Sequence, residues 1–109
     1  MTFSEYQAEA MKTAVYPRGK YAVVYPALGL TGEAGEVAEK VKKVVRDHGA
    51  DFGPEAVEAI TRELGDVLWY IAAMADDLGI SLDRVAETNI AKLRSRAQRD
   101  RLHGSGDDR

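Results

Sequence analysis

Apolar residues recur along this chain with the period of an α-helix, about 3.6 residues, and no stretch alternates with period two for long. The pattern therefore predicts an all-α chain. The first helix is expected at about residues 4–15, with Thr2 or Ser4 as its N-cap. The sequence YPRGKY, residues 16–21, is expected to break this helix.

Three further helices are expected after this break. They run from about Val24 to His48, from Pro54 to a stop at Gly79, and from a cap at Ser81 to about Arg99. Proline suits a first helical turn, where its missing N–H would be unbonded anyway, and glycine suits a C-terminal stop, as at Gly49. We therefore expect a four-helix bundle in one domain, residues 1–100, followed by a glycine-rich, flexible C-terminal tail, residues 101–109.

Composition narrows the classes of function. No run approaches the roughly 18 apolar residues of a membrane span, and the first ten residues carry Glu5 and Glu9 rather than a signal-peptide pattern, so a soluble cytoplasmic protein is expected. The net charge of −3 gives no reason to expect nucleic acid as a partner. The absence of cysteine leaves carboxylate and histidine side chains as candidates for metal binding or catalysis.

Two pairs of acids stand at helical spacing, Glu33 with Glu36 and Glu63 with Asp66. Residues three apart on a helix lie about 60° apart, so the members of each pair share one side. Each pair borders the apolar stripe of its helix. If the two helices pack antiparallel through these stripes, the four carboxylates meet in one cleft.

Four carboxylates in one cleft would repel one another strongly, and a divalent cation would resolve that repulsion. Oxygen ligands favour Mg²⁺ or Mn²⁺, and Mg²⁺ commonly shares its shell with substrate phosphates. Glycines beside the acids, Gly32, Gly35 and Gly65, each cost about 1 kcal/mol against alanine in a helix, which indicates close backbone approach. Small-residue helix packing beside solvated acids is the alternative, and the spacing alone leaves both open.

The ordered pattern E-x-x-E, then residues 37–62, then E-x-x-D, carried by GLTGEAGEVAEKVKK and ELGDVLWYI, resembles the MazG-like nucleoside triphosphate pyrophosphohydrolases. NIAKLRSR and GSGDDR extend this resemblance, which covers most of the chain from about Tyr25 onward. It implies an all-α fold whose helices form bundles across the subunits of a homodimer or homotetramer. It also implies Mg²⁺-dependent hydrolysis of nucleoside triphosphates between the α and β phosphates, giving monophosphate and pyrophosphate. House-cleaning of the nucleotide pool is the role we expect.

The resemblance also implies which residues form the site. The expected metal ligands are Glu33, Glu36, Glu63 and Asp66. A Mg²⁺ ion on these acids would neutralise phosphate charge and lower the pKa of an attacking water. Glu36 is the candidate catalytic base, because it lies furthest from the apolar stripe.

Two more residues on these helices are candidates for substrate contact. Lys40 lies one turn after Glu36 and could meet a phosphate oxygen, or it could simply pair with Glu36. Tyr70 lies one turn beyond Asp66 and could stack on a base or donate to a phosphate. Trp69 lies well away from the apolar stripe, so we expect a subunit interface to bury it.

A third candidate group lies on the last helix. Asn89, Lys92 and Arg96 share one face and match the pattern N-x-x-K-x-x-x-R, for which the resemblance implies contact with the triphosphate. A solvated, cationic helix C-terminus is the alternative.

Two other functions stay open at this point. Phosphoribosyl-ATP pyrophosphohydrolases have similar acid pairs, although the tail after the last helix argues mildly against that substrate. A helical nucleotide-binding or interaction module would keep the fold without turnover.

Overall fold

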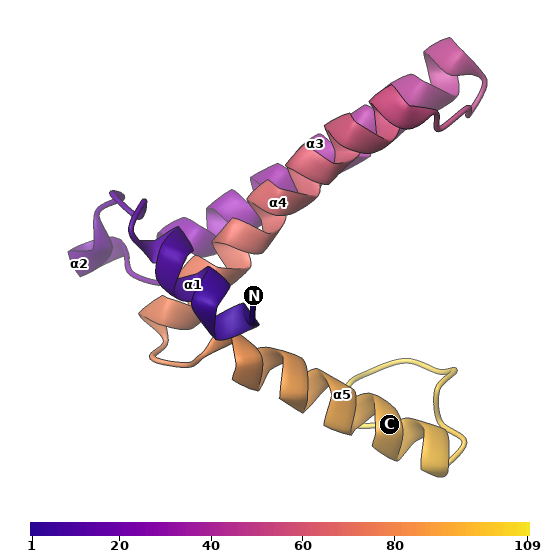
Figure 1. Cartoon of the computed structure of the whole chain (residues 1–109). Coiled ribbons are helices and arrows are strands. Elements are labelled where there is room, and N and C mark those ends of the chain that lie inside the picture. The colour runs from indigo at the N-terminus through magenta and orange to yellow at the C-terminus, as the bar shows by residue number, and fades with distance from the viewer.

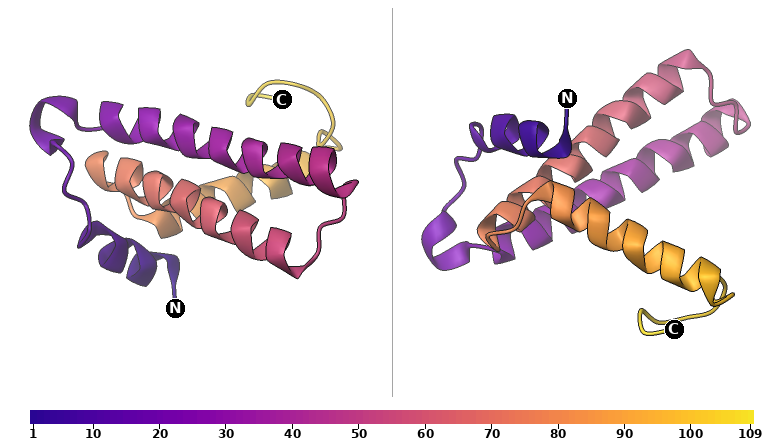
Figure 2. Two further views of the ribbon diagram at one scale, coloured as in Figure 1. Left: turned by 90° about the horizontal axis from the view of Figure 1, so that it is seen from above. Right: turned by 60° about the horizontal axis from the view of Figure 1, so that its bottom comes forward.

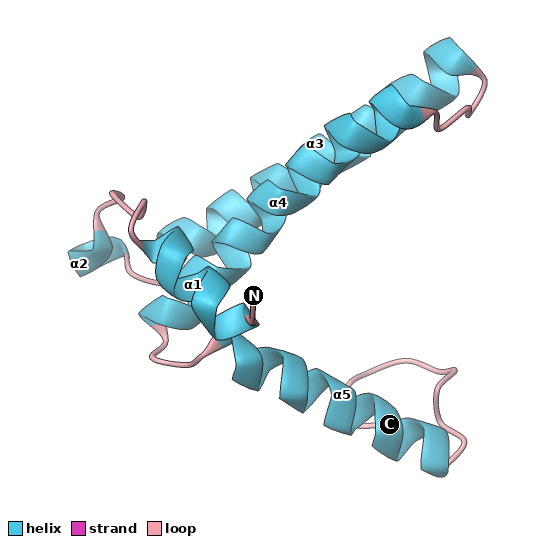
Figure 3. Ribbon diagram, viewed as in Figure 1, coloured by secondary structure: helices cyan, strands magenta, loops and turns pink.

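Five α-helices and no strand make up the protein in the computed structural model, which describes residues 1–109 (Figures 1 and 3). They are α1 Phe3–Met11, α2 Arg18–Tyr21, α3 Val24–His48, α4 Pro54–Asp77 and α5 Leu82–Gln98. The predicted all-α class is confirmed, and α3 has the predicted bounds. The first helix is shorter than predicted, and the short α2 within the expected break was missed.

Local sequence accounts for several helix ends. Thr2 caps α1: its hydroxyl accepts from the Glu5 N–H at 3.0 Å, while the Glu5 carboxylate accepts from the Thr2 N–H. Ser81 caps α5 by accepting from the Arg84 N–H at 3.1 Å. Gly49 ends α3 in the left-handed conformation, at φ 57°.

The antiparallel pair α3 and α4 is the main body of the molecule, with the two helices side by side along their length (Figure 2). α1 packs on α4 near its C-terminal end, and α5 leaves that end at an angle, as a separate arm (Figures 1 and 2). No helix is both long and apolar enough to cross a bilayer.

The side chain of Gln7 ties α1, α4 and α5 together where they meet. Its Nε2 donates to the Ala72 and Ile80 carbonyls, each at 3.2 Å, and its Oε1 accepts from the Leu82 N–H at 3.0 Å. Ala72 and Leu82 are buried beside it. This buried amide therefore fixes where α5 begins relative to α4, a role that the sequence does not reveal.

An aspartate holds the segment between α1 and α3 against the end of α4. The Asp77 carboxylate accepts from the Tyr16 hydroxyl at 2.8 Å, from Arg18 Nε at 2.9 Å and from the Val23 N–H at 2.9 Å. Its side chain is 2% exposed. Val23 itself has a φ of 68°, which is uncommon for a β-branched residue. Tertiary contact, rather than helix propensity, sets the path of the chain here.

The fold is open for its length. Its radius of gyration is 16.7 Å, against about 13 Å for a compact domain of this size, and only ten residues are buried. Large apolar side chains remain exposed on the three long helices, among them Leu28, Leu64 and Ile90. Together these features leave apolar surface that one copy of the chain does not cover.

Candidate functional site

Three of the four predicted acids come together between α3 and α4. Glu33 on α3 and Glu63 and Asp66 on α4 each place a carboxylate oxygen within 4.8 Å of the others. Glu33 and Glu63 are half-buried, and Asp66 is exposed. Because the helices are antiparallel, residues far apart in sequence meet at one point of their contact.

The electrostatics of this acid cluster, Glu33, Glu63 and Asp66, are unfavourable as the chain stands. Burial raises the pKa of Glu33, and the carboxylates of Asp66, Glu63 and Glu36 raise it further. A raised carboxyl pKa means that the folded protein disfavours the charged form. The cluster thus has the chemistry of a cation site, with oxygen donors whose mutual repulsion a divalent ion would relieve.

Glu36 lies outside the acid cluster, although its charge acts on Glu33. Its side chain is exposed, one turn further along α3. The expectation that all four acids converge is therefore met for three, and the role of Glu36 as ligand or base stays a prediction.

The glycines beside the acids do not serve close packing within the chain. A Cβ added at Gly32, Gly35 or Gly65 would meet nothing within 4 Å, so no other part of the chain makes the predicted close approach, and tight packing around a bound ligand stays a prediction. The close approach occurs one turn earlier, where a Cβ on Gly29 would overlap the Tyr70 ring. Gly29 was missed, because a glycine that admits a ring from another helix has no sequence signal of its own.

Tyr70 lies next to the acid cluster, as the sequence predicted. Burial raises its pKa, and electrostatic interactions with Tyr25, Glu33 and Asp66 raise it further. The phenol therefore keeps its proton and remains a hydrogen-bond donor. Burial and the Asp66 charge likewise raise the pKa of Tyr6 on α1, which places a second tyrosine near the cluster that the sequence did not single out.

Trp69 is half-buried within one copy of the chain, which the sequence did not predict, and burial of its remaining surface at a subunit interface stays a prediction. Its Nε1 donates to Thr13 Oγ1 at 2.9 Å and to the Ala10 carbonyl at 3.2 Å. The ring meets Tyr70 edge-on at 5.0 Å and Tyr16 at 6.2 Å between centroids. α1 covers this indole because the chain folds back over α4, which the helical angle of Trp69 alone could not show.

Aromatic rings continue from Tyr70 toward the start of α3. Tyr25 stacks on Tyr16, with their centroids 4.9 Å apart and their planes 3° from parallel. Tyr16 is buried, and Tyr25 is 41% exposed. The side of the acid cluster on which Tyr70 lies is therefore aromatic and partly open to solvent.

Lys40 lies away from the acid cluster. It lines a hollow of about 550 Å³ at the far end of the α3–α4 pair, together with Lys43 and His48. It makes no ion pair, with Glu36 or any other acid. The predicted pairing with Glu36 is therefore not formed, and contact of Lys40 with a substrate phosphate stays a prediction.

The cations of α5 are also separate from the acids. α5 packs on α1 and α4 through its first turns and points away from the α3–α4 pair (Figure 1). Asn89 is exposed, and Lys92 and Arg96 form ion pairs with Asp107 at 3.1 and 3.3 Å. One copy of the chain therefore does not bring the predicted phosphate contacts to the acid cluster.

Comparison with known proteins gives two matches. The family described as the MazG nucleotide pyrophosphohydrolase domain matches residues 26–99, which hold the acid cluster and the α5 cations. The "Gene 37 protein" of Mycobacterium phage L5 is 42% identical over 109 residues, covering 95% of this chain and 96% of that protein. No solved structure matches.

Proposed function

Because the chain belongs to the MazG nucleotide pyrophosphohydrolase family, we propose that it hydrolyses nucleoside or deoxynucleoside triphosphates between the α and β phosphates. The products are the nucleoside monophosphate and pyrophosphate, and the role is house-cleaning of the nucleotide pool. The observation that carries the proposal is the acid cluster, where three carboxylate oxygens from two helices lie within 4.8 Å.

The cluster fits Mg²⁺, or Mn²⁺ in its place. Hard cations take carboxylate oxygens, and Mg²⁺ keeps positions for water and substrate phosphates, which the exposed side of Asp66 leaves room for. Glu33, Glu63 and Asp66 would hold the ion, with Glu36 as the expected fourth ligand. When bound, it would neutralise phosphate charge and make a bound water more acidic.

The chain's own groups would then orient the substrate. The Tyr70 phenol, which keeps its proton, would donate to a phosphate oxygen or face the base. Where it does not itself bind the ion, the exposed Glu36 carboxylate would accept a proton from the attacking water, and no protein nucleophile is needed. Lys92 and Arg96 would bind the triphosphate from the α5 of a neighbouring copy.

Homo-oligomer formation, as a dimer or tetramer, completes the proposal. Exposed apolar positions on α3, α4 and α5 offer surface for a second copy. A neighbouring copy's α5 could supply the cations that the chain's own α5 directs away from its acids. Light scattering after size exclusion should give a mass of at least twice 11.9 kDa; a monomer would contradict this part.

A nucleotide panel tests the proposed reaction. With Mg²⁺, the protein should release pyrophosphate from at least one nucleoside triphosphate, and EDTA should abolish release. Monophosphate must appear in equal amount, since cleavage at the β–γ bond would give diphosphate and phosphate instead. Cleavage of phosphoribosyl-ATP alone, or nucleotide binding without product, would contradict the proposal in favour of the other two functions.

Substitution of Gly29 tests the packing that positions Tyr70. Gly29→Ala should destabilise the protein by about 1–2 kcal/mol, because overlap with a ring held by Trp69 outweighs the roughly 1 kcal/mol that alanine contributes to helix propensity. Gly32→Ala is the matched control and should be neutral or stabilising, since its added methyl meets nothing. Urea unfolding with EDTA present measures both; equal effects would contradict the assigned contact.

A further inference from the structure

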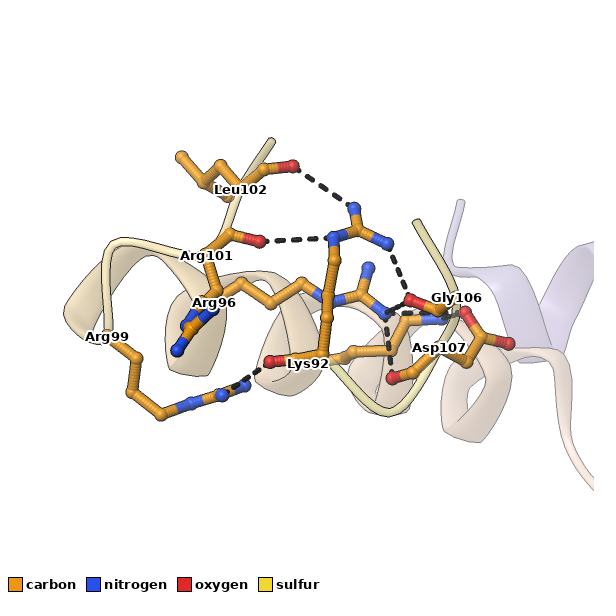
Figure 4. A network of polar contacts seen from close by, with 8 residues as sticks. Lys92, Arg96, Arg99, Arg101, Leu102, Gly106 and Asp107 are labelled. Carbon is orange, nitrogen blue, oxygen red and sulfur yellow. Dashed lines mark hydrogen bonds and ion pairs between the residues drawn. The ribbon is translucent and has the colours of Figure 1, made fainter. Parts of the chain in front are cut away.

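The C-terminal segment, residues 101–109, folds back along the last turns of α5 (Figure 4). Gly104 and Gly106 make this turn possible, with φ values of 137° and 83° that side-chain-bearing residues rarely adopt. Arg109 closes the loop by donating to the carbonyls of Arg101 at 3.1 Å, Leu102 at 3.1 Å and Gly106 at 2.6 Å. The segment is thus a folded loop with its own hydrogen bonds.

Asp107 in this loop forms ion pairs with both cations that are predicted to bind phosphate, Lys92 and Arg96. Its Oδ1 lies 3.1 Å from Lys92 Nζ and 3.3 Å from Arg96 Nη2, and its carbonyl accepts from the same Nη2 at 2.9 Å (Figure 4). Hydrogen bonds from Lys92 and then Arg96 hold the pKa of Asp107 below its usual range, so the carboxylate is ionised at neutral pH. An anion of the chain itself therefore stands where a substrate phosphate is expected.

Arg96 is poorly satisfied by this partner. Its side chain is only 6% exposed, yet Nε is buried with no hydrogen-bond partner, and all of its contacts come from Nη2. A phosphate group offers three acceptor oxygens and more negative charge than the single carboxylate oxygen that Asp107 presents. The Arg96 guanidinium therefore has N–H donors, among them Nε, that Asp107 leaves without an acceptor.

Asp107 is also easy to displace. Its side chain is 85% exposed, and ion pairs with so exposed a partner contribute little to stability. The loop can therefore release the two cations without unfolding α5, whose backbone bonds do not depend on Asp107.

We propose that Asp107 is an intramolecular competitor for a polyphosphate-binding site formed by Lys92 and Arg96, and that the C-terminal segment leaves this site when the anion binds. The inference rests on the proposed function, which assigns these cations to the triphosphate. The inference adds that in the free protein Asp107 pairs with the two cations. Only molecules with the loop open can bind the polyphosphate, so its apparent affinity falls in proportion to the fraction that is open.

Binding of inorganic tripolyphosphate to the full chain, measured by calorimetry with EDTA present, tests this directly. Asp107→Asn keeps the size of the side chain and removes its charge, so it should bind about three- to tenfold more tightly than the unsubstituted protein. Asp108→Asn is the matched control: it makes the same charge change one residue away, and Asp108 contacts neither cation, so its affinity should stay close to the original. In a Lys92→Met background the gain from Asp107→Asn should shrink, because one of the two competed cations is gone.

Several results would overturn the proposal. Equal affinity of Asp107→Asn and the unsubstituted protein would mean that Asp107 does not compete. Weaker binding would mean that the loop helps to hold the anion, and absence of binding in every protein would remove the site. The readout is independent of turnover: nucleotide hydrolysis with no gain from Asp107→Asn refutes the competitor alone, and tighter tripolyphosphate binding without any hydrolysis refutes the proposed reaction alone.

Discussion

Substituting Glu63 by glutamine or Asp66 by asparagine is expected to lower Mg²⁺-dependent pyrophosphate release by about 100-fold or more, because each change removes an oxygen ligand with its charge from the acid cluster. Initial rates at saturating nucleotide and Mg²⁺ measure the effect. Glu39→Gln is the matched control, since Glu39 lies on α3 but pairs with Lys42 and Lys43 at the surface. Its rate should be nearly unchanged.

Removing a charge from the acid cluster should lower activity but raise the stability of the metal-free protein. Glu33→Gln removes a carboxylate that burial and its acidic neighbours disfavour, so with EDTA it should raise the melting temperature. Mg²⁺ should stabilise the unsubstituted protein by mass action and leave Glu33→Gln nearly unaffected. If Glu33→Gln lowered the melting temperature in EDTA, or kept the full Mg²⁺ response, Glu33 would have a purely structural role.

Asp77→Asn should give the second large effect, a loss of about 2–3 kcal/mol in the free energy of unfolding. The substitution removes a buried charge that accepts three hydrogen bonds, from Tyr16, Arg18 and Val23, and asparagine cannot pair with the Arg18 guanidinium in the same way. Urea unfolding at neutral pH measures it. Asp76→Asn is the control: its side chain is 42% exposed and meets Arg18 at the surface, so its cost should be under about 1 kcal/mol.

The pH dependence of this effect has a definite sign. Burial by itself would raise the pKa of Asp77, but the bonds from the Val23 N–H, Arg18 and Tyr16 outweigh it and hold the pKa below its usual value. A carboxyl with a lowered folded-state pKa stabilises the protein above its unfolded pKa, about 3.9, and loses that contribution as pH falls through the folded value. The difference between the unsubstituted protein and Asp77→Asn should therefore be constant near neutral pH and shrink below about pH 4. A difference that grows in acid would contradict this assignment.

The polar contacts around Asp77 matter for function because a chain of aromatic contacts connects Asp77 to the candidate site. Asp77 accepts a hydrogen bond from Tyr16, and the Tyr16 ring stacks on Tyr25 and meets Trp69, whose ring in turn meets Tyr70 next to the acid cluster. Loss of Asp77 should thus loosen the aromatic side of the candidate site while leaving the acids themselves in place.

The sequence by itself determined the helices and the identity of the acids. Apolar period, Pro54, Gly49 and Ser81 act within a few residues, so the end of α3, the start of α4 and the N-cap of α5 follow from local chemistry. The spacing of the four acids along two apolar stripes predicted that they meet if the helices pack antiparallel, and three of them, Glu33, Glu63 and Asp66, do so. These helix ends and this meeting of acids can be predicted from sequence because each depends on one helix, or on the antiparallel packing of two.

Only the tertiary structure decided what depends on where helices cross and how segments fold back. It gave the close approach to Gly29 rather than to the glycines beside the acids, and it covered Trp69 with α1. It also directed α5 away from the acid cluster and placed Asp107 on the predicted phosphate cations. The physical reason is that these contacts join residues tens of positions apart, or follow from glycine turns in a loop, and no period in the sequence records which surfaces will meet.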